Sequence, residues 1–207
     1  MLTAPGCLQL HRALLLDTLD FTASLPVSRR LFLADCSARE LGLFEQELVS
    51  SGISLQGLEL KRQRGAELGS RLRNAYLELA EAHTRVVFLG ADSPTLPLEW
   101  LQLAFEVLSH HSFVIGPTRD GGYYCLGIRE DRPVLFQGID WGTAKVFQQT
   151  TRQLRPGEFQ LLPAWYDVDV PADLQRLRRD LDAWPQGRPG RPQRTSSFLD
   201  ACAFLSS

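Results

Sequence analysis

The stretch "VVFLGADSPTLP", Val86 to Pro97, decides the fold class of this chain. Its first four residues are β-branched or bulky and do not alternate with polar residues. This pattern is typical of an interior strand that is covered on both faces, as in a parallel sheet. Asp92 follows the strand, and open α/β sheets bind their ligands at the carboxyl ends of their strands. We therefore expect Asp92 to face a ligand, although Asp-Ser-Pro is also a common turn sequence.

The rest of the sequence alternates between helical and strand-like segments. Helices are predicted at 8–21, 38–50, 67–82, 97–109, 143–154 and 171–181; strands are predicted at 30–34, 53–60, 86–89, 113–116 and 123–128, with an extended segment at 159–168. Repeated βα units predict an α/β domain over residues 1–184, with a mostly parallel sheet and helices on both faces. Residues 185–207 are rich in Pro, Gly, Arg and Ser, and we expect a flexible tail with a short helical end at 198–205.

Composition excludes several classes of protein. Hydrophobic residues make up 44% of the 207 residues and charged residues 22%, which is ordinary for a soluble globular protein. A formal net charge of -2 gives no reason to expect a nucleic-acid or membrane partner. The four cysteines are scattered without C-x-x-C spacing, which argues against a zinc site or a disulfide framework. With no long apolar stretch and no signal-peptide pattern, we expect a cytoplasmic protein.

A second acidic segment, "YDVDVPADL", spans residues 166–174. Asp173 suits the positive end of the helix that begins near Pro171, whereas Asp169 precedes that proline and is poorly placed for capping alone. Of Asp167 and Asp169, we expect only one to face a given site. If Asp92 and Asp169 converge from their distant segments, their carboxylates would hold a hard cation such as Mg²⁺ or Mn²⁺.

Two glycine-containing stretches each have a structural and a functional interpretation. In "GPTRDGGYYCLGI", Gly121 and Gly122 either leave room for a ligand against bare backbone or permit a hairpin turn. In "QRGAELGSRL", residues 63–72, glycines at a helix start either let backbone amides approach an anion or form an ordinary loop.

Taken in order, these motifs and two others resemble one bacterial family of GT-A-fold transferases. The segments are "QRGAELGSRL", "VVFLGADSPTLP", "GPTRDGGYYCLGI", "LFQGIDWGT" and "WYDVDVPADL". The family comprises glycosyltransferases described as radical-SAM/selenium-domain-associated or of the arsenosugar-biosynthesis type. It is similar to phospholactate guanylyltransferase and molybdenum-cofactor guanylyltransferase. The match runs from about His11 to Leu181 and implies a GT-A-like, nucleotide-diphospho-sugar-transferase three-layer sandwich.

The resemblance also implies roles for individual residues. Asp92, with Ser93 beside it, stands where the family has a catalytic acid that contacts metal and phosphate, and Asp169 takes the place of the second metal acid. Asp120, as a catalytic residue, matches the acceptor-side loop together with Gly121 and Gly122. Positions that match the nucleotide cleft are Gln63, Gly65, Glu67 and Gly69, and positions that match a segment closing over the site are Trp141, Gly142 and Thr143.

The N-terminal sequence departs from the family pattern. Relatives open with a strand and a basic loop resembling K-x-P-x-x-G-x-V-K-T-R-L, whereas this sequence begins in the helix that should follow the loop. We therefore expect a sheet that lacks its usual first strand. The strand at Leu31 to Ala34 would then pair elsewhere, expose an edge, or recruit a second copy to form a homodimer.

These observations predict an enzyme: a metal-dependent glycosyltransferase that acts on a nucleotide or nucleotide-sugar substrate with Mg²⁺ or Mn²⁺. Two alternatives remain open. One is a nucleotidyltransferase of the guanylyltransferase type. The other is a non-catalytic copy of the fold that has lost its nucleotide loop.

Overall fold

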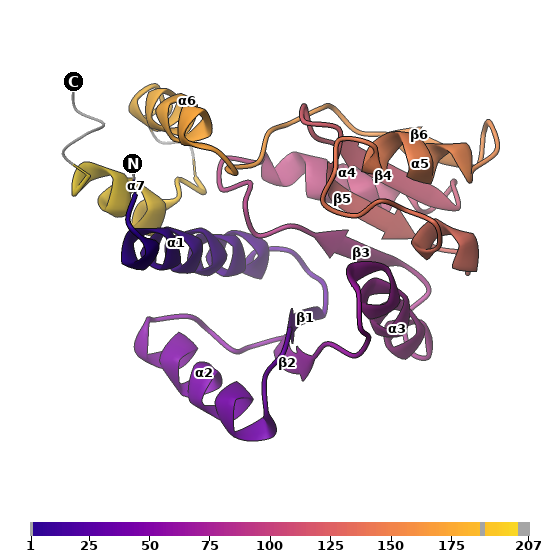
Figure 1. Ribbon diagram of the computed structural model, residues 1–207, viewed down its shortest axis with the longest axis horizontal. Coiled ribbons are helices and arrows are strands. Elements are labelled where there is room, and N and C mark those ends of the chain that lie inside the picture. The colour runs from indigo at the N-terminus through magenta and orange to yellow at the C-terminus, as the bar shows by residue number, and fades with distance from the viewer. Residues whose placement is uncertain (1, 187–188, 203–207) are drawn as a thin grey trace.

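The structure is a computed structural model that describes residues 2–186 and 189–202 (Figure 1). The helices are α1 (Ala4–Ala23), α2 (Ala38–Ser50), α3 (Leu68–Ala80), α4 (Leu98–Val107), α5 (Val146–Arg152), α6 (Pro171–Asp182) and α7 (Gln193–Asp200), with a 3-10 helix η1 (Pro133–Phe136). The strands are β1 (Arg29–Leu33), β2 (Leu58–Arg62), β3 (Val86–Leu89), β4 (Phe113–Pro117), β5 (Tyr123–Ile128) and β6 (Phe159–Leu161).

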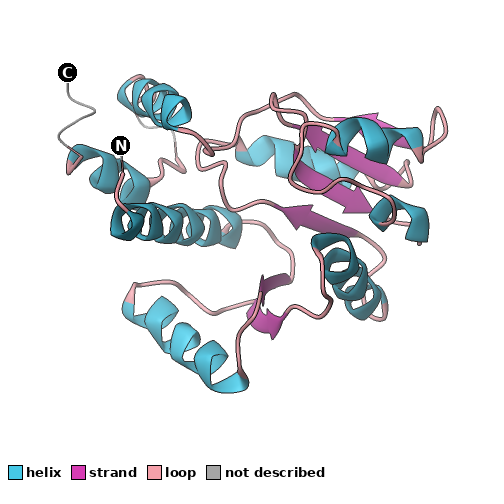
Figure 2. Ribbon diagram, in the orientation of Figure 1, coloured by secondary structure: helices cyan, strands magenta, loops and turns pink. Residues whose placement is uncertain are grey.

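The strands form two separate sheets, as Figure 2 shows. Strands β1 and β2 pair in parallel, and the larger sheet has the order β3-β5-β4-β6. Strand β5 runs antiparallel to both β3 and β4, whereas β4 and β6 are parallel. The α/β class is therefore confirmed, but the expectation of a mostly parallel sheet is wrong. A short loop joins β4 to β5 as a hairpin, and a connection of that length can only join antiparallel strands.

Strand β2 begins later than the sequence pattern predicts. The apolar run from Ile53 suggested a strand over 53–60, yet the N–H of Leu58 bonds to the carbonyl of Leu55 at 3.0 Å and closes a turn there. Gly57 takes a positive φ of 68° in this turn. The extended backbone therefore starts only after Gly57, because a turn and a strand require different dihedral angles.

Helices cover both faces of the larger sheet. Side chains of α4, including Leu101 and Leu108 at its end, pack on one face against Val114. On the other face, Tyr76 of α3 and residues of η1 and α5 pack around Phe113, Ile115 and Leu126. Successive residues of β4 thus point to opposite cores, as alternation along a strand requires. This layering leaves the ends of the strands as the accessible part of the sheet.

Helix α1 links the remaining elements to the sheets. Its Leu10 and Leu14 pack with α6, α7 and the segment around Tyr166, and its Leu16 and Leu19 pack with α2 and the β1-β2 pair. In Figure 1 the C-terminal half of α1 points toward the space between β1 and β3. No helix of the described residues is both long and apolar enough to cross a membrane.

The C-terminal region is helical over residues 193–200, so the helix expected at 198–205 begins earlier than predicted, inside the expected flexible tail. Residues 193–200 form α7, and its Leu199 is fully buried against α1 and α6. Asp17 of α1 accepts hydrogen bonds from the N–H groups of Arg194 and Thr195, at 3.1 and 2.7 Å. The composition argument missed residues 193–197 of this helix because its stability comes from a cap and a docking face on α1, not from its own apolar content. Residues 203–205 of the expected helical end lie outside the described residues.

Candidate functional site

Three aspartates converge at the edge of the larger sheet where β3 and β4 end. Carboxylate oxygens of Asp120, Asp167 and Asp169 all lie within 4.8 Å of one another, close enough to hold one metal ion. Asp120 follows β4, whereas Asp167 and Asp169 come from the segment between β6 and α6. The site therefore combines residues that are far apart in the sequence.

Backbone hydrogen bonds hold these segments side by side. The N–H of Trp165 donates to the carbonyl of Pro117 at 3.0 Å, and the N–H of Val168 donates to the carbonyl of Asp92 at 3.0 Å. Trp165 also forms an isolated parallel bridge with Thr118. The segment that carries Asp167 thus lies between the loop after β3 and the loop after β4, and this position fixes the acidic residues relative to both strands.

Asp167 and Asp169 face the same site, so the expectation that only one of them would do so is wrong. Residues two apart in an extended segment point to the same side. Tyr166 and Val168, the alternate positions, are buried in the core beside α6. Asp167 is therefore a candidate ligand that the sequence interpretation missed, and its spacing from Asp169 was the available signal.

The glycine-containing loop after β4 fixes the orientation of the Asp120 carboxylate. Its Oδ1 accepts hydrogen bonds from the Thr118 hydroxyl and from the Gly122 N–H, the latter at 3.0 Å. Gly121 has a φ of 97°, and a Cβ there would lie 2.2 Å from the carbonyl oxygen of Ala144. A side chain cannot fit at position 121, so this glycine serves the turn and its contact with the segment before α5.

Asp92 lies next to this cluster but outside the closest group of three. Its carboxylate lies against Gly90: a Cβ atom added to Gly90 would be only 2.7 Å from Asp92 Oδ1. Its charge interacts with those of Asp169 and Asp120, so the predicted partners Asp92 and Asp169 do share one site. The three carboxylates close enough to share one metal ion, however, are those of Asp120, Asp167 and Asp169.

The site carries an excess of negative charge. Burial, and then the neighbouring Asp120, Asp169 and Asp92, raise the pKa of Asp167 to about 6. Burial is also the main cause that raises the pKa values of Asp92 and Asp169. Among the described residues, none of these four aspartates forms an ion pair with Lys or Arg. His11 of α1 lies close enough for its charge to favour the charged forms of Asp92 and Asp169.

These residues fit a hard divalent cation. Carboxylate oxygens are the preferred ligands of Mg²⁺ and Mn²⁺, and clustered carboxylates without a cation repel one another. The carboxylates would therefore be stabilised by a bound cation, and the buried Ser93 hydroxyl next to Asp92 has no hydrogen-bond partner among the described residues, although it does not line the cavity.

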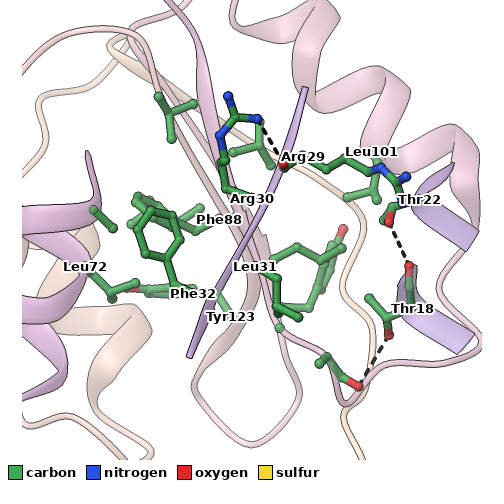
Figure 3. A pocket seen from close by; sticks show the side chains of 18 of the residues that line it. Thr18, Thr22, Arg29, Arg30, Leu31, Phe32, Leu72, Phe88, Leu101 and Tyr123 are labelled. Carbon is green, nitrogen blue, oxygen red and sulfur yellow. Dashed lines mark hydrogen bonds between the residues drawn. The ribbon is translucent and has the colours of Figure 1, made fainter. Parts of the chain in front are cut away.

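A cavity of about 950 Å³ opens beside the aspartates. Figure 3 shows part of its wall, with Leu72, Phe88 and Tyr123 around it. Of the residues predicted from the sequence, those that line it are Gln63, Asp92, Asp120, Gly122, Trp141, Thr143 and Asp169. Gly142, which the resemblance placed in the same closing segment as Trp141 and Thr143, also lines it, and so does Asp167, which was not predicted. The predicted positions Gly65, Glu67, Gly69, Ser93 and Gly121 are not part of its wall.

Two of these remaining positions lie at the start of α3. A Cβ at Gly69 would meet the indole Nε1 of Trp141 at 2.6 Å, so this glycine lets α3 approach Trp141 closely. Glu67 begins α3, and its N–H bonds to the hydroxyl of Ser70 at 3.2 Å. His11, like Asp167, was not predicted as a site residue, and a lone histidine on a helix gave no signal that could have identified it.

Comparison with known proteins shows a close structural relative. The chain superposes with a TM-score of 0.84 on the crystal structure of a protein from Desulfovibrio desulfuricans G20, described as a "putative nucleotide-diphospho-sugar transferase". The two sequences are 31% identical, and the match covers 97% of this chain and 85% of that chain. No curated protein shows a significant match.

A family profile matches residues 18–143, which is more than half of the chain. The matched range contains Asp92, Asp120 and the glycine loop, while Asp167 and Asp169 lie beyond it. The chain therefore belongs to the DUF2064 family, described as uncharacterized proteins conserved in bacteria.

Proposed function

We propose that this protein is a metal-dependent transferase that acts on a nucleotide-diphosphate sugar and transfers the glycosyl group. The observation that carries the proposal is the convergence of Asp120, Asp167 and Asp169 at the wall of a cavity large enough for such a substrate, with no Lys or Arg paired to them among the described residues. The fold it shares with the Desulfovibrio desulfuricans protein supports the substrate class. The motif resemblance to glycosyltransferases favours glycosyl over nucleotidyl transfer.

In this proposal Asp120, Asp167 and Asp169 hold one Mg²⁺ or Mn²⁺ ion. The bound ion would supply positive charge to the diphosphate, which becomes more negative as it leaves. The bond between the anomeric carbon and the diphosphate oxygen breaks with its electron pair on the oxygen, and an acceptor hydroxyl bonds to the same carbon. The protein contributes mainly by positioning the two reactants, so no nucleophilic Ser or Cys is required.

Asp92 is the residue we assign to proton transfer. Burial raises the pKa of its carboxyl group, and the group lines the cavity beside the three metal-binding aspartates. A carboxylate with a raised pKa is a better proton acceptor near neutral pH. Asp92 would therefore accept the proton of the attacking hydroxyl.

The aromatic Trp141, in edge contact with Tyr123 at a centroid distance of 6.4 Å, forms a rigid wall for the substrate.

The test is calorimetric titration with a panel of nucleotide-diphosphate sugars, with and without Mn²⁺. We expect binding that strengthens at least about tenfold with Mn²⁺, and loss of this gain in Asp169→Asn and Asp120→Asn. Asp182→Asn is the matched control, because Asp182 is an exposed aspartate paired with Arg178 on α6. Binding that is indifferent to the metal and to both site variants would refute the proposal.

The products identify the reaction. Glycosyl transfer or slow hydrolysis of the donor releases a nucleoside diphosphate, whereas nucleotidyl transfer to a sugar phosphate releases pyrophosphate. We expect the nucleoside diphosphate. Its release should fall in Asp92→Asn while Mn²⁺-dependent donor binding is retained, because Asp92 acts on the acceptor and not on the metal.

A further inference from the structure

The side chain of Tyr166 lies on the inner side of the segment that carries the acidic residues. Asp167 and Asp169 line the cavity, whereas Tyr166, one position earlier, is buried with only 3% of its surface exposed. Its hydroxyl accepts a hydrogen bond from the Thr95 hydroxyl at 2.9 Å and donates one to Asp180 Oδ2 at 2.6 Å. One buried hydroxyl therefore joins three parts of the chain: the loop after β3, the acidic segment and α6.

The chemistry of the three groups fixes the direction of these two hydrogen bonds. An ionised carboxylate can only accept, so the proton of Tyr166 goes to Asp180, and the Thr95 hydroxyl must then donate to the tyrosine oxygen. The guanidinium of Arg176 lies 3.9 Å from the centre of the Tyr166 ring and adds a second contact from α6. Thr95 is itself buried, so loss of the tyrosine hydroxyl would leave the Thr95 hydroxyl without its acceptor.

A backbone hydrogen bond joins the same two segments on the other side of Asp167. The N–H of Val168 donates to the carbonyl of Asp92 at 3.0 Å, and Thr95 lies three residues beyond Asp92 in the same loop. Asp167 is therefore held between two anchors, the side chain of Tyr166 before it and the backbone of Val168 after it. Both anchors fix it to the loop that carries Asp92.

We propose that Tyr166 is a positioning residue for the metal-binding aspartates, because its hydroxyl sets the place of the acidic segment relative to Asp92. The inference rests on the proposed function, since the metal site is part of it. Tyr166 does not line the cavity and touches neither metal nor substrate in this proposal. A working site needs its groups within about 0.5 Å of their productive positions, so a small shift of the segment would weaken metal binding although every ligand is still present.

The first experiment is Tyr166→Phe, which keeps the aromatic ring and removes only the hydroxyl. We expect the affinity for Mn²⁺ alone, measured by calorimetry, to fall about tenfold. The electron paramagnetic resonance spectrum of the bound Mn²⁺ should also change, because the geometry of its ligands changes. Tyr76→Phe is the matched control, since Tyr76 is a buried tyrosine of α3 that does not line the cavity. Wild-type affinity and an unchanged spectrum in Tyr166→Phe would overturn the proposal.

A second control separates positioning from a general loss of stability. The carbonyl of Glu158 bonds to the N–H of Phe113, where β4 begins, and its carboxylate pairs with Arg132. This is the end of β4 away from the aspartates, so Glu158→Ala should lower the midpoint of urea denaturation without changing the affinity for Mn²⁺. If Glu158→Ala weakens Mn²⁺ binding as much as Tyr166→Phe does at an equal loss of stability, the proposal is wrong.

Thr95 provides an independent test of the same hydrogen bond. Thr95→Val removes the donor to Tyr166 at nearly constant volume and should weaken Mn²⁺ binding, whereas Thr95→Ser keeps a hydroxyl and should retain most of the affinity. The double variant with Thr95→Val and Tyr166→Phe should bind Mn²⁺ about as well as Tyr166→Phe alone, because both changes remove one interaction. Fully additive losses would contradict the proposal.

Hydrogen exchange of the metal-free protein distinguishes a failure of this inference from a failure of the proposed function. If Tyr166 anchors the acidic segment, the amide of Val168 should exchange about tenfold faster in Tyr166→Phe, with no metal required. A wild type that binds no Mn²⁺ but shows this faster exchange in the variant would refute the proposed function while supporting the anchoring that we infer. Unchanged exchange at Val168 would overturn the inference even if the wild type binds Mn²⁺.

Discussion

The carbonyl of Asp92 accepts a hydrogen bond from the N–H of Val168 at 3.0 Å and so joins the two acidic segments of the chain. This bond sets the loop after β3 against the segment that carries Asp167 and Asp169. With Asp120 added from the β4-β5 loop, the result is a cluster of carboxylates with no Lys or Arg partner among the described residues. The proposed metal chemistry follows from this juxtaposition.

Stability of the metal-free protein should depend on pH through Asp167. Its pKa is raised from 3.8 to about 6, so the folded state binds this proton more tightly than the unfolded state does. Protonated Asp167 therefore stabilises the folded protein at pH values below the pKa that this residue has in the unfolded chain. This stabilisation is lost as the pH rises through about 6, the pKa of Asp167 in the folded protein. We expect Asp167→Asn to match the wild type near pH 4 and to become the more stable protein above about pH 6.

The measurement is thermal denaturation of both proteins across this range, with divalent ions removed. Mn²⁺ should then raise the melting temperature of the wild type at neutral pH more than that of Asp167→Asn, because the ion binds the folded state only. A difference between the proteins that is constant across the pH range would show that Asp167 titrates normally.

Gly121 should tolerate no side chain, in contrast to Gly138. Both have positive φ, 97° and 64°, but a Cβ at Gly121 would collide with the carbonyl of Ala144 while a Cβ at Gly138 meets nothing within 4 Å. Gly138→Ala should cost about 1 kcal/mol of folding free energy from backbone strain alone, and Gly121→Ala at least about twice that. Urea denaturation of the two variants gives the comparison, and equal losses would argue against the close contact.

Asp17 should hold α7 in place. Its buried carboxylate caps the N–H groups of Arg194 and Thr195 from α1, and Asp17→Ala leaves both donors without this partner. We expect a loss of about 2 kcal/mol and faster proteolysis around residues 189–192. Asp20→Ala is the control, because Asp20 also pairs with Arg194 but is exposed. Its effect should be about 0.5 kcal/mol, and an equal effect of the two variants would count against the cap.

Sequence patterns predicted most elements but not how the sheets are built. The strands Val86–Leu89 and Tyr123–Ile128 and the helix Ala38–Ser50 occur within the predicted bounds, because apolar periodicity is a local property. Strand direction depends on pairing partners, so the antiparallel placement of β5 could not be predicted from the continuous apolar run alone. Residues 193–197, the first part of α7, were missed for a related reason, since the helix is capped by Asp17, a residue remote in the sequence.

The candidate site was predicted in part. Asp92, Asp120 and Asp169 do come together, since turn and strand-end positions of a sheet share one edge. Asp167 was left out although its two-residue spacing from Asp169 carried the information. The cavity beside the aspartates is lined by both β1 and β3, which belong to separate sheets. This arrangement could not be predicted from the sequence, because it depends on where the strands lie in space.

The most direct test of the central claim is anomalous diffraction from crystals of the protein soaked with Mn²⁺ and a nucleoside diphosphate. We predict one manganese peak between the carboxylates of Asp120, Asp167 and Asp169, in contact with the diphosphate. An ordered diphosphate with manganese bound away from these three aspartates, or with none, would contradict the account.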